Sequence, residues 1–209
     1  MIISHKHKFI FFKPWKVAGN SVEYNLIQHC GDNDLIDSTH RNPKDTLDII
    51  GKKKFDKYFK FTIVRNPWDR IVSYFWWKDG GLIGENHRKN VDKLCKMNFD
   101  GYEFKEQFAK FVGNYTHFNE PFYYNNDGEM IMDFYMKYER IATDYKKICK
   151  KLKIPYEQLR QLGKFPFKKK NENYWKYFNH ESGSVVSWRH RKTIELFNYT
   201  CGPKPKMNN

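Results

Sequence analysis

The chain has 209 residues, of which 40% are hydrophobic and 18% aromatic, and its formal net charge at pH 7 is +14. The hydrophobic content excludes a wholly disordered chain, and the length suits one sizeable α/β core better than two domains. The positive charge indicates an anionic partner, which is a nucleic acid, an anionic membrane surface, or an anionic small molecule or polymer.

No segment of the sequence predicts a secretory signal or a membrane span. The apolar run at residues 9–12 is too short for either, and no stretch of about 18 apolar residues occurs elsewhere. We therefore expect a cytoplasmic protein without a transmembrane segment. His5 and His7 precede this run, in a terminus that we expect to be mobile.

Cysteine spacing argues against a zinc site. The four cysteines are widely separated: Cys30, Cys95, Cys149 and Cys201. None forms a C-x-x-C pair, which is the usual spacing of structural zinc ligands. The spread suits buried or free thiols in a reducing compartment, although it does not exclude disulfides.

The first part of the chain alternates between strand and helix patterns. In chain order it predicts a buried strand at residues 8–12, a loop at 13–20, a helix at 21–30, a short strand at 35–37, a helix at 43–50 that ends at Gly51, and a strand at 60–65. Asn66 caps the next helix and Pro67 takes its first position, which is a favoured arrangement. The apolar residues of that helix fall on one face: Trp68, Ile71, Val72, Phe75 and Trp76.

The second part continues the alternation. It predicts a polar loop with some helix at residues 82–101, a helix at 103–112, a strand at 130–136, a helix at 140–152, a basic loop at 166–173, a final helix at 185–197 and a frayed tail at 202–209. Strands that alternate with helices indicate a parallel sheet with helical crossovers. In such sheets ligands bind beyond the carboxyl ends of the strands.

Two strand–loop–helix segments carry residues suited to phosphate. Residues 16–21 (KVAGNS) combine a lysine, two small residues and a helix start, where backbone N–H groups and the helix dipole favour anions. In the second segment, Arg65 ends a strand and Ser73 lies two turns along the next helix, so the pair can grip one phosphate. Each segment also has a plain structural interpretation: a solvated Lys16 at a helix entry, and an Arg65–Asp69 pair that staples the helix start.

Together these segments resemble the motifs of the sulfotransferases that use 3′-phosphoadenosine 5′-phosphosulfate (PAPS), especially the carbohydrate-type members. Residues 16–21 are similar to their P-K-T-A-[GS]-T-S loop, and residues 65–73 to their R-[ND]-P-x-x-R-x-x-S segment. Weaker similarities occur at residues 133–145 and 195–199. Trp15 stands where the loop motif usually has proline, and Val17 and Asn20 stand where it has threonine.

The resemblance implies an α/β, three-layer P-loop-like fold with a central parallel sheet flanked by helices, formed by one domain over residues 1–209 with a flexible tail at 202–209. It implies PAPS as the sulfuryl donor, 3′-phosphoadenosine 5′-phosphate (PAP) as the product, no metal, and an acceptor hydroxyl, with a glycan expected. The residues that it assigns to the nucleotide are Lys16, Val17, Ala18, Gly19, Asn20, Ser21, Arg65, Ser73, Lys168, Lys170 and Tyr174. Lysines 168 and 170 with Tyr174 belong to a late basic loop, which otherwise reads as a solvated charge run.

The reaction also needs a base for the acceptor hydroxyl and a cation beside the leaving oxygen. Histidine is suited to the first role because its ordinary pKa is near neutrality. His40 follows a predicted strand and matches the family's base in order, so we assign it as the base, with Lys16 as the catalytic cation. His117 resembles a family position near the acceptor.

Two other functions remain open from the sequence. A nucleotide kinase of related architecture is disfavoured because no G-x-x-x-x-G-K-[ST] loop is present. A nucleic-acid-binding module would explain the positive charge, but a basic surface equally suits an anionic glycan, and we expect no nucleic acid partner.

Overall fold

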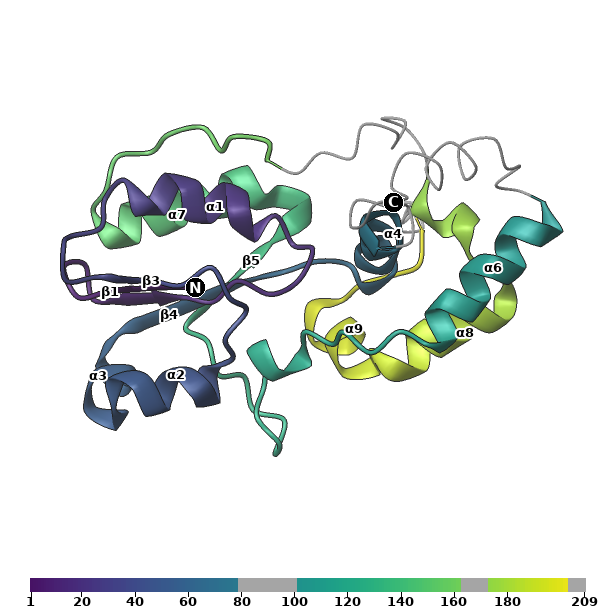
Figure 1. Cartoon of the computed structure of the whole chain (residues 1–209), viewed down its shortest axis with the longest axis horizontal. Helices are drawn as coiled ribbons and strands as arrows, with labels where there is room; N and C mark the ends of the chain where they lie inside the picture. Colours follow the sequence, from purple (N-terminus) through teal and green to yellow (C-terminus); the bar gives the residue numbers. More distant parts are fainter. Residues whose placement is uncertain (79–100, 163–172, 203–209) are drawn as a thin grey trace, which may run out of the picture. The chain divides into compact units, whose positions relative to one another are not determined.

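The computed structural model describes residues 1–78, 101–162 and 173–202 (Figure 1). The chain divides into two compact units. The first unit comprises Met1–Arg65 and Phe118–Gly163 and contains the sheet, and the second comprises Asn66–His117 and Lys164–Asn209 and is helical. That the whole chain acts as one domain stays a prediction.

A five-stranded sheet with the order β3-β1-β2-β4-β5 forms the centre of the first unit. The strands are β1 (Ile2–Ser4), β2 (Phe9–Phe11), β3 (Leu35–Ile36), β4 (Phe59–Val64) and β5 (Phe134–Lys137). β2, β4 and β5 are parallel, as predicted, but β1 is antiparallel to both of its neighbours. The sheet is therefore mixed, with a parallel core.

The prediction of a mobile N-terminus is wrong. Residues Ile2 and Ile3 are fully buried in β1, and the backbone N–H of His5 donates to Asp34 Oδ1 at 2.6 Å. Lys8 adopts a left-handed φ of 54°, which helps the chain to reverse between β1 and β2. A strand of three residues is too short to show a periodic pattern, so β1 could not be predicted from the sequence.

Strand directions bring several chain segments to one edge of the sheet. Because β3 and β2 are both antiparallel to β1, they run the same way, and β4 and β5 share that direction. The carboxyl ends of β2, β3, β4 and β5 therefore lie at the same edge. This is the edge at which parallel sheets bind ligands.

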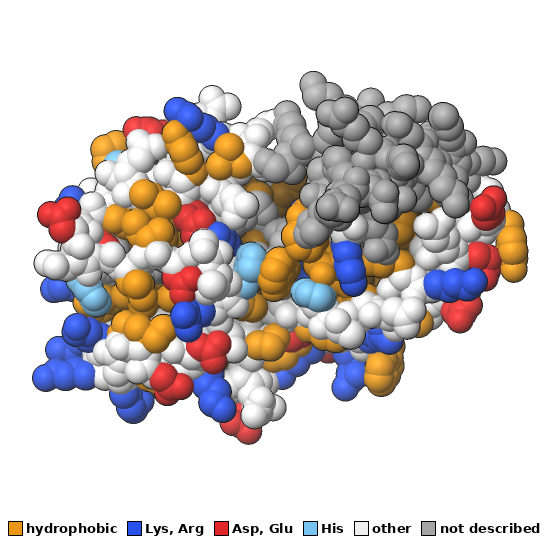
Figure 2. Space-filling view, in the orientation of Figure 1, with side chains coloured by type: hydrophobic (Ala, Val, Ile, Leu, Met, Phe, Trp, Pro, Cys, Tyr) orange, Lys and Arg blue, Asp and Glu red, His pale blue; other side chains and the backbone are white. Residues whose placement is uncertain are grey.

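Helices cover both faces of this sheet, so the chain has the mixed α/β class expected from its sequence (Figure 1). On one face lie α1 (Gly19–Ile27) and α7 (Ile141–Leu152), and on the other lie α2 (Pro43–Ile50) and α3 (Lys52–Lys57). Short 3₁₀ turns occur at Glu120–Phe122 (η1) and Tyr138–Arg140 (η2). Figure 2 shows basic side chains gathered over α3, whose lysines are exposed: Lys52, Lys53, Lys54 and Lys57.

The second unit packs around aromatic rings. Its elements are α4 (Pro67–Lys78), α6 (Tyr102–Gly113), η3 (Tyr174–Tyr177), α8 (His180–Arg189) and α9 (Arg191–Phe197). The predicted apolar face of α4 is buried throughout, and Phe75 makes edge-to-face contacts with Phe104 and Phe108. The Nε1–H of Trp76 donates to the hydroxyl of Tyr177 at 3.0 Å.

The predicted final helix at residues 185–197 is wrong as a single element. It starts earlier, at an Asn179 capping box, and breaks at His190, whose backbone (φ −110°, ψ 16°) leaves the helical region. None of the helices in the described ranges has the length and apolarity needed to cross a membrane. The polar loop predicted at 82–101 (except residue 101), the basic loop predicted at 166–173 (except residue 173) and tail residues 203–209 lie outside the described residues.

Asp144 joins β5 to α7 in the first unit. Its fully buried carboxylate accepts hydrogen bonds from the backbone N–H of Lys137, at 2.9 Å, and from the side chains of Arg140 and Lys147. Burial raises the pKa of Asp144, but the three donors together lower it by a larger amount. The net pKa therefore lies below the ordinary value. The carboxylate is therefore part of what fixes the start of α7.

Replacing Asp144 with asparagine should lower the free energy of unfolding by about 1–3 kcal/mol at pH 7, because the buried negative charge and one of its two acceptor oxygens are removed. A lowered folded pKa means that the stabilisation is present above the unfolded pKa of about 3.9 and is lost as the pH falls through the folded pKa. Urea unfolding at several pH values measures both effects. The matched control is Asp56→Asn, which removes an exposed pair with Lys52 and should change stability little. A similar loss in both variants would contradict the role of Asp144.

Candidate functional site

The loop between β2 and α1 leaves the carboxyl edge of the sheet from a fixed point. The backbone N–H of Phe12 donates to the carbonyl of Phe61 at 3.0 Å, and the hydroxyl of Thr62 donates to the carbonyl of Phe12 at 3.1 Å. Both backbone groups of Phe12 are thus bound to β4. Residues 13–18 begin their path from this anchored residue.

Within this loop the backbone twice adopts a left-handed conformation. Lys16 has a φ of 58° and Ala18 a φ of 65°, which is uncommon for residues other than glycine and costs free energy. Val17 between them is fully buried, so its side chain anchors the loop in the core. This strained loop delivers the chain to the N-terminus of α1.

Ala18, and not Asn20, is the N-cap of α1. No side chain in the described part of the chain caps this helix, and its first turn carries no acidic residue. Asn20 is exposed and lies inside the first turn. Asn20 is therefore not the cap, and α1 begins at Gly19, two residues before the helix start predicted at residue 21.

Gly19 is required by a close approach of Lys13. A Cβ atom built on Gly19 would lie 2.3 Å from Lys13 Cγ. The Lys13 side chain is itself buried and pairs with Glu23 at 2.6 Å, so it has little room to move. The loop and the first turn of α1 consequently fit together only without a side chain at residue 19.

We expect Gly19→Ala to lower the free energy of unfolding by about 1–3 kcal/mol, because the added methyl overpacks a buried contact. Gly113→Ala is the matched control, since its Cβ would meet no atom within 4 Å. That variant should be neutral or slightly stabilising. Thermal unfolding of both proteins measures the difference, and equal melting temperatures would show that Lys13 moves aside freely.

Lys16 and Arg65 place two positive charges at the carboxyl edge. The buried guanidinium of Arg65 donates to the carbonyl of Lys16 at 2.8 Å and lies 4.0 Å from the ring centre of Tyr138, which follows β5. Burial, and then the charge of Arg65, lower the pKa of Lys16 to about 8. An anion at this edge would relieve that repulsion.

His40 reaches the same edge from the end of β3. Its Nδ1 lies 2.6 Å from the carbonyl oxygen of Lys13. Because a carbonyl can only accept, Nδ1 carries the proton, and Nε2 of the neutral ring is left with a lone pair. The ring stacks on Trp15 with centroids 3.7 Å apart, and burial is the main cause that lowers the pKa of His40 below its usual value.

Asn119 is a residue of this edge that sequence reasoning missed. Its buried side-chain amide accepts from the backbone N–H of Trp15 at 3.1 Å and donates to the carbonyl of Trp15 at 2.9 Å. The two residues are 104 positions apart in the chain. No local motif marks Asn119, so only the folded chain reveals the contact.

Ser21 has a buried hydroxyl in α1. Its Oγ accepts from the backbone N–H of Leu162 at 3.2 Å, so it also ties α1 to the chain that follows α7. The first unit thus contains eight of the predicted site residues: Lys16, Val17, Ala18, Gly19, Asn20, Ser21, His40 and Arg65. Ser73, His117 and Tyr174 belong to the second unit, and Lys168 and Lys170 lie outside the described residues.

In the second unit Ser73 is half-buried on α4, and Tyr174 is tied into the end of the chain. The hydroxyl of Tyr174 accepts from Asn66 Nδ2 at 3.0 Å and donates to the carbonyl of Thr200 at 3.2 Å. Asn66 also accepts from the backbone N–H of Trp68 at 3.1 Å, which confirms it as the cap of α4. These bonds give Tyr174 a structural role within its unit.

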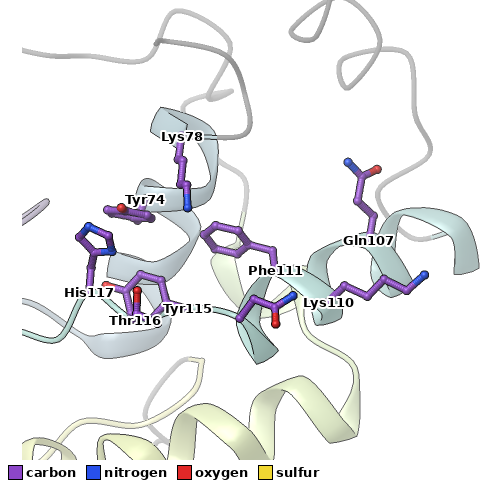
Figure 3. Close-up of a pocket in the computed structure, with 9 residues that line it drawn as sticks. Tyr74, Lys78, Gln107, Lys110, Phe111, Tyr115, Thr116 and His117 are labelled. Atoms are coloured by element: carbon purple, nitrogen blue, oxygen red, sulfur yellow. The ribbon is translucent and has the colours of Figure 1, made fainter. Parts of the chain in front are cut away.

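His117 lines a cavity of about 280 Å³ in the second unit (Figure 3). The lining combines three aromatic residues, two lysines, one histidine and three neutral polar residues: Tyr74, Phe111, Tyr115, Lys78, Lys110, His117, Gln107, Asn114 and Thr116. Buried Arg70 donates to the carbonyl of His117 at 3.0 Å and to the hydroxyl of Tyr115. Arg70, which sequence reasoning left without a role, therefore holds the segment that carries His117.

Among the described residues, no group of three or more His, Cys, Asp or Glu side chains lies close enough together to hold a metal ion. Cys30, Cys149 and Cys201 are free thiols, and Cys95 lies outside the described residues. The candidate site is therefore built from a strained loop, a helix N-terminus, two cations and a histidine of fixed tautomer.

Comparison with known proteins gives a consistent result. A model of the sulfotransferase family matches residues 1–198 of the chain. An uncharacterized protein of Archaeoglobus fulgidus is 31% identical over 110 residues, which cover 52% of this chain and 78% of that protein. No solved structure shows significant similarity to the chain.

Proposed function

The chain belongs to the sulfotransferase family, and from that premise we propose that it transfers a sulfuryl group from PAPS to an acceptor hydroxyl. The observation that carries this proposal is that Arg65 and His40 both contact the strained loop that contains Lys16. Two cations suit the phosphates of the donor, and a neutral histidine suits the proton of the acceptor. We propose further that the first unit is P-loop-like in the way it binds phosphate, although its lysine precedes the small residues of the loop.

The donor would lie at the carboxyl edge of the sheet. We propose that the N-terminus of α1 and the backbone of residues 16–19 bind the 5′-phosphosulfate, as helix N-termini bind anions in general. Arg65 would contact the 3′-phosphate. The proposed roles of Ser73, Tyr174, Lys168 and Lys170 in nucleotide binding rest on the sequence motifs alone and stay predictions.

The proposed reaction is an in-line displacement at sulfur. His40 Nε2 takes the proton from the acceptor hydroxyl while the acceptor oxygen forms a bond to sulfur. The bond between sulfur and the bridging oxygen breaks, and its electron pair stays on the phosphate of PAP. The ammonium of Lys16 stabilises this oxygen as its negative charge grows, which is an interaction that strengthens in the transition state.

We propose a carbohydrate as the acceptor, and His117 as one of its contacts. The cavity of the second unit supports this because it offers aromatic faces together with amide, hydroxyl and ammonium groups (Figure 3). Flat apolar faces beside a few polar groups suit a sugar, which has C–H faces and hydroxyl edges. The aromatic faces come from Tyr74 and Phe111.

PAP should stabilise the protein more than AMP, which lacks the 3′-phosphate. A ligand bound only to the folded chain adds about 2.7 kcal/mol at a concentration 100 times its Kd. Arg65→Ala should weaken PAP binding by about 2–3 kcal/mol, measured by calorimetry, because a charge-assisted contact is lost. AMP binding should change little. Arg160→Ala is the control, since Arg160 is exposed and stacks on Tyr24 instead. Equal affinities of PAP and AMP would contradict a 3′-phosphate site.

The pH dependence of kcat/KM should be bell-shaped. His40 must be neutral to act, and because its pKa is lowered, the rising limb should lie below pH 6.5. Lys16 must be protonated, so the rate should fall as the pH rises through about 8. His40→Ala should remove the rising limb and lower the rate about 10²–10⁴-fold. Lys16→Arg, whose side chain stays charged, should remove the falling limb.

Initial rates with saturating acceptor and varied PAPS measure these limbs. His180→Ala serves as the control because His180 is exposed at the start of α8 in the other unit. It should leave both limbs unchanged. A His40→Ala enzyme that keeps most of its activity would overturn the assignment of His40, and His117 would then be the base to test.

A further inference from the structure

A single buried amide holds the backbone of Trp15. The side chain of Asn119 is 1% exposed, and it engages both the N–H and the carbonyl of Trp15, at 3.1 Å and 2.9 Å. An amide that bonds both backbone groups of one residue fixes the orientations of the two peptide units on either side of that residue. The backbone of Trp15 is therefore held in place by Asn119, the residue just before η1.

The ring of Trp15 in turn forms one wall of the His40 site. The two ring planes are inclined by 28° with centroids 3.7 Å apart, so the imidazole lies on the indole face. Trp15 also occupies the position at which the motif resembled by this loop usually has proline. A proline has no aromatic face, so this stacking is a feature of the present chain.

The third constraint on His40 comes from Lys13. The Lys13 carbonyl accepts from Nδ1 at 2.6 Å, and its side chain is pinned by Glu23 at 2.6 Å. The charged groups that act on His40 are the ammonium of Lys13, the amino group of Met1 and the carboxylate of Glu23. The two cations and the carboxylate oppose one another, which leaves burial as the dominant influence.

We infer that Asn119 and Trp15 are positioning residues that hold His40 with Nε2 as its proton acceptor. Asn119 orients Trp15, Trp15 fixes the plane of the imidazole, and the Lys13 carbonyl selects the tautomer. The catalytic part of this inference rests on the proposed role of His40 as the base. A purely structural role for Asn119 would instead affect stability and leave the chemistry of His40 unchanged.

The test uses the full chain with ¹⁵N-labelled histidine. Long-range ¹H–¹⁵N spectra distinguish a protonated ring nitrogen from one that carries a lone pair, and so report the tautomer and the pKa of His40 without any turnover. In the wild type we expect the Nδ1–H tautomer. Asn119→Ala should yield a mixture of tautomers and lower kcat about 10- to 100-fold, the size of effect expected from misplacing a catalytic group.

Asn25→Ala is the matched control for Asn119. Asn25 is also buried in the first unit, and its amide also donates to the backbone of a distant segment, at Glu157 and Gln158. Both alanine variants should lose stability, but only Asn119→Ala should alter the tautomer of His40. The same spectrum for wild type and Asn119→Ala would overturn the inference.

Trp15 gives a second test that does not depend on the folding of Asn119→Ala. Trp15→Ala exposes His40, so the pKa of His40 should rise towards its ordinary value and the rising limb of kcat/KM should move to higher pH. Trp15→Phe keeps an aromatic face against His40, so its rising limb of kcat/KM should lie close to that of the wild type. An unmoved limb and an unmoved His40 titration in Trp15→Ala would overturn the inference.

Failure of the inference and failure of the proposed function give different results. If His40→Ala keeps most of its activity, His40 is not the base. A shifted tautomer in Asn119→Ala would then support the positioning contact while the catalytic role is lost. The opposite result is an inactive His40→Ala enzyme together with a normal tautomer and a normal kcat in Asn119→Ala. That result would support His40 as the base and would overturn the positioning role of Asn119.

Discussion

The environment of Lys13 is the constraint on which the candidate site depends. Its side chain runs past Gly19 into a buried pair with Glu23, and its carbonyl accepts a hydrogen bond from Nδ1–H of His40. A lysine is rarely buried unless its charge is paired, so removing Glu23 would leave an uncompensated charge in the interior. One residue thus fixes both the start of α1 and the tautomer of the histidine. The loop residues Lys16 and Val17 follow Lys13 in the chain, so their positions depend on how Lys13 is held.

Much of the fold follows from local signals. The helix Pro43–Ile50 was predicted with its observed bounds because a proline begins it and Gly51 ends it. The strand β4 and the buried face of α4 were predicted because their apolar residues have the periods of a strand and a helix. These elements share one property: the residues that decide the structure lie within a few positions of one another.

The rest of the site could not be predicted, because its contacts join distant parts of the chain. The clamp of Asn119 on Trp15 and the contact of Arg65 with the Lys16 carbonyl span many residues and show no local pattern. Strand β1 is too short to have a period, yet it lies between β2 and β3 and so sets where His40 emerges. The motifs indicated which residues matter, while the geometry among them depends on tertiary structure.

The lowered pKa of Lys16 has a consequence for how an anion would bind. In the unliganded protein, burial and the neighbouring Arg65 bring this pKa to about 8, so a fraction of the molecules lacks the Lys16 proton at mildly alkaline pH. A bound phosphate would favour the charged amine and raise the pKa again. Ligand binding is then coupled to proton uptake from solution, and affinity becomes a function of proton concentration. Because Lys16 and Arg65 lie close together, an anion that binds at this edge is expected to bind together with a proton.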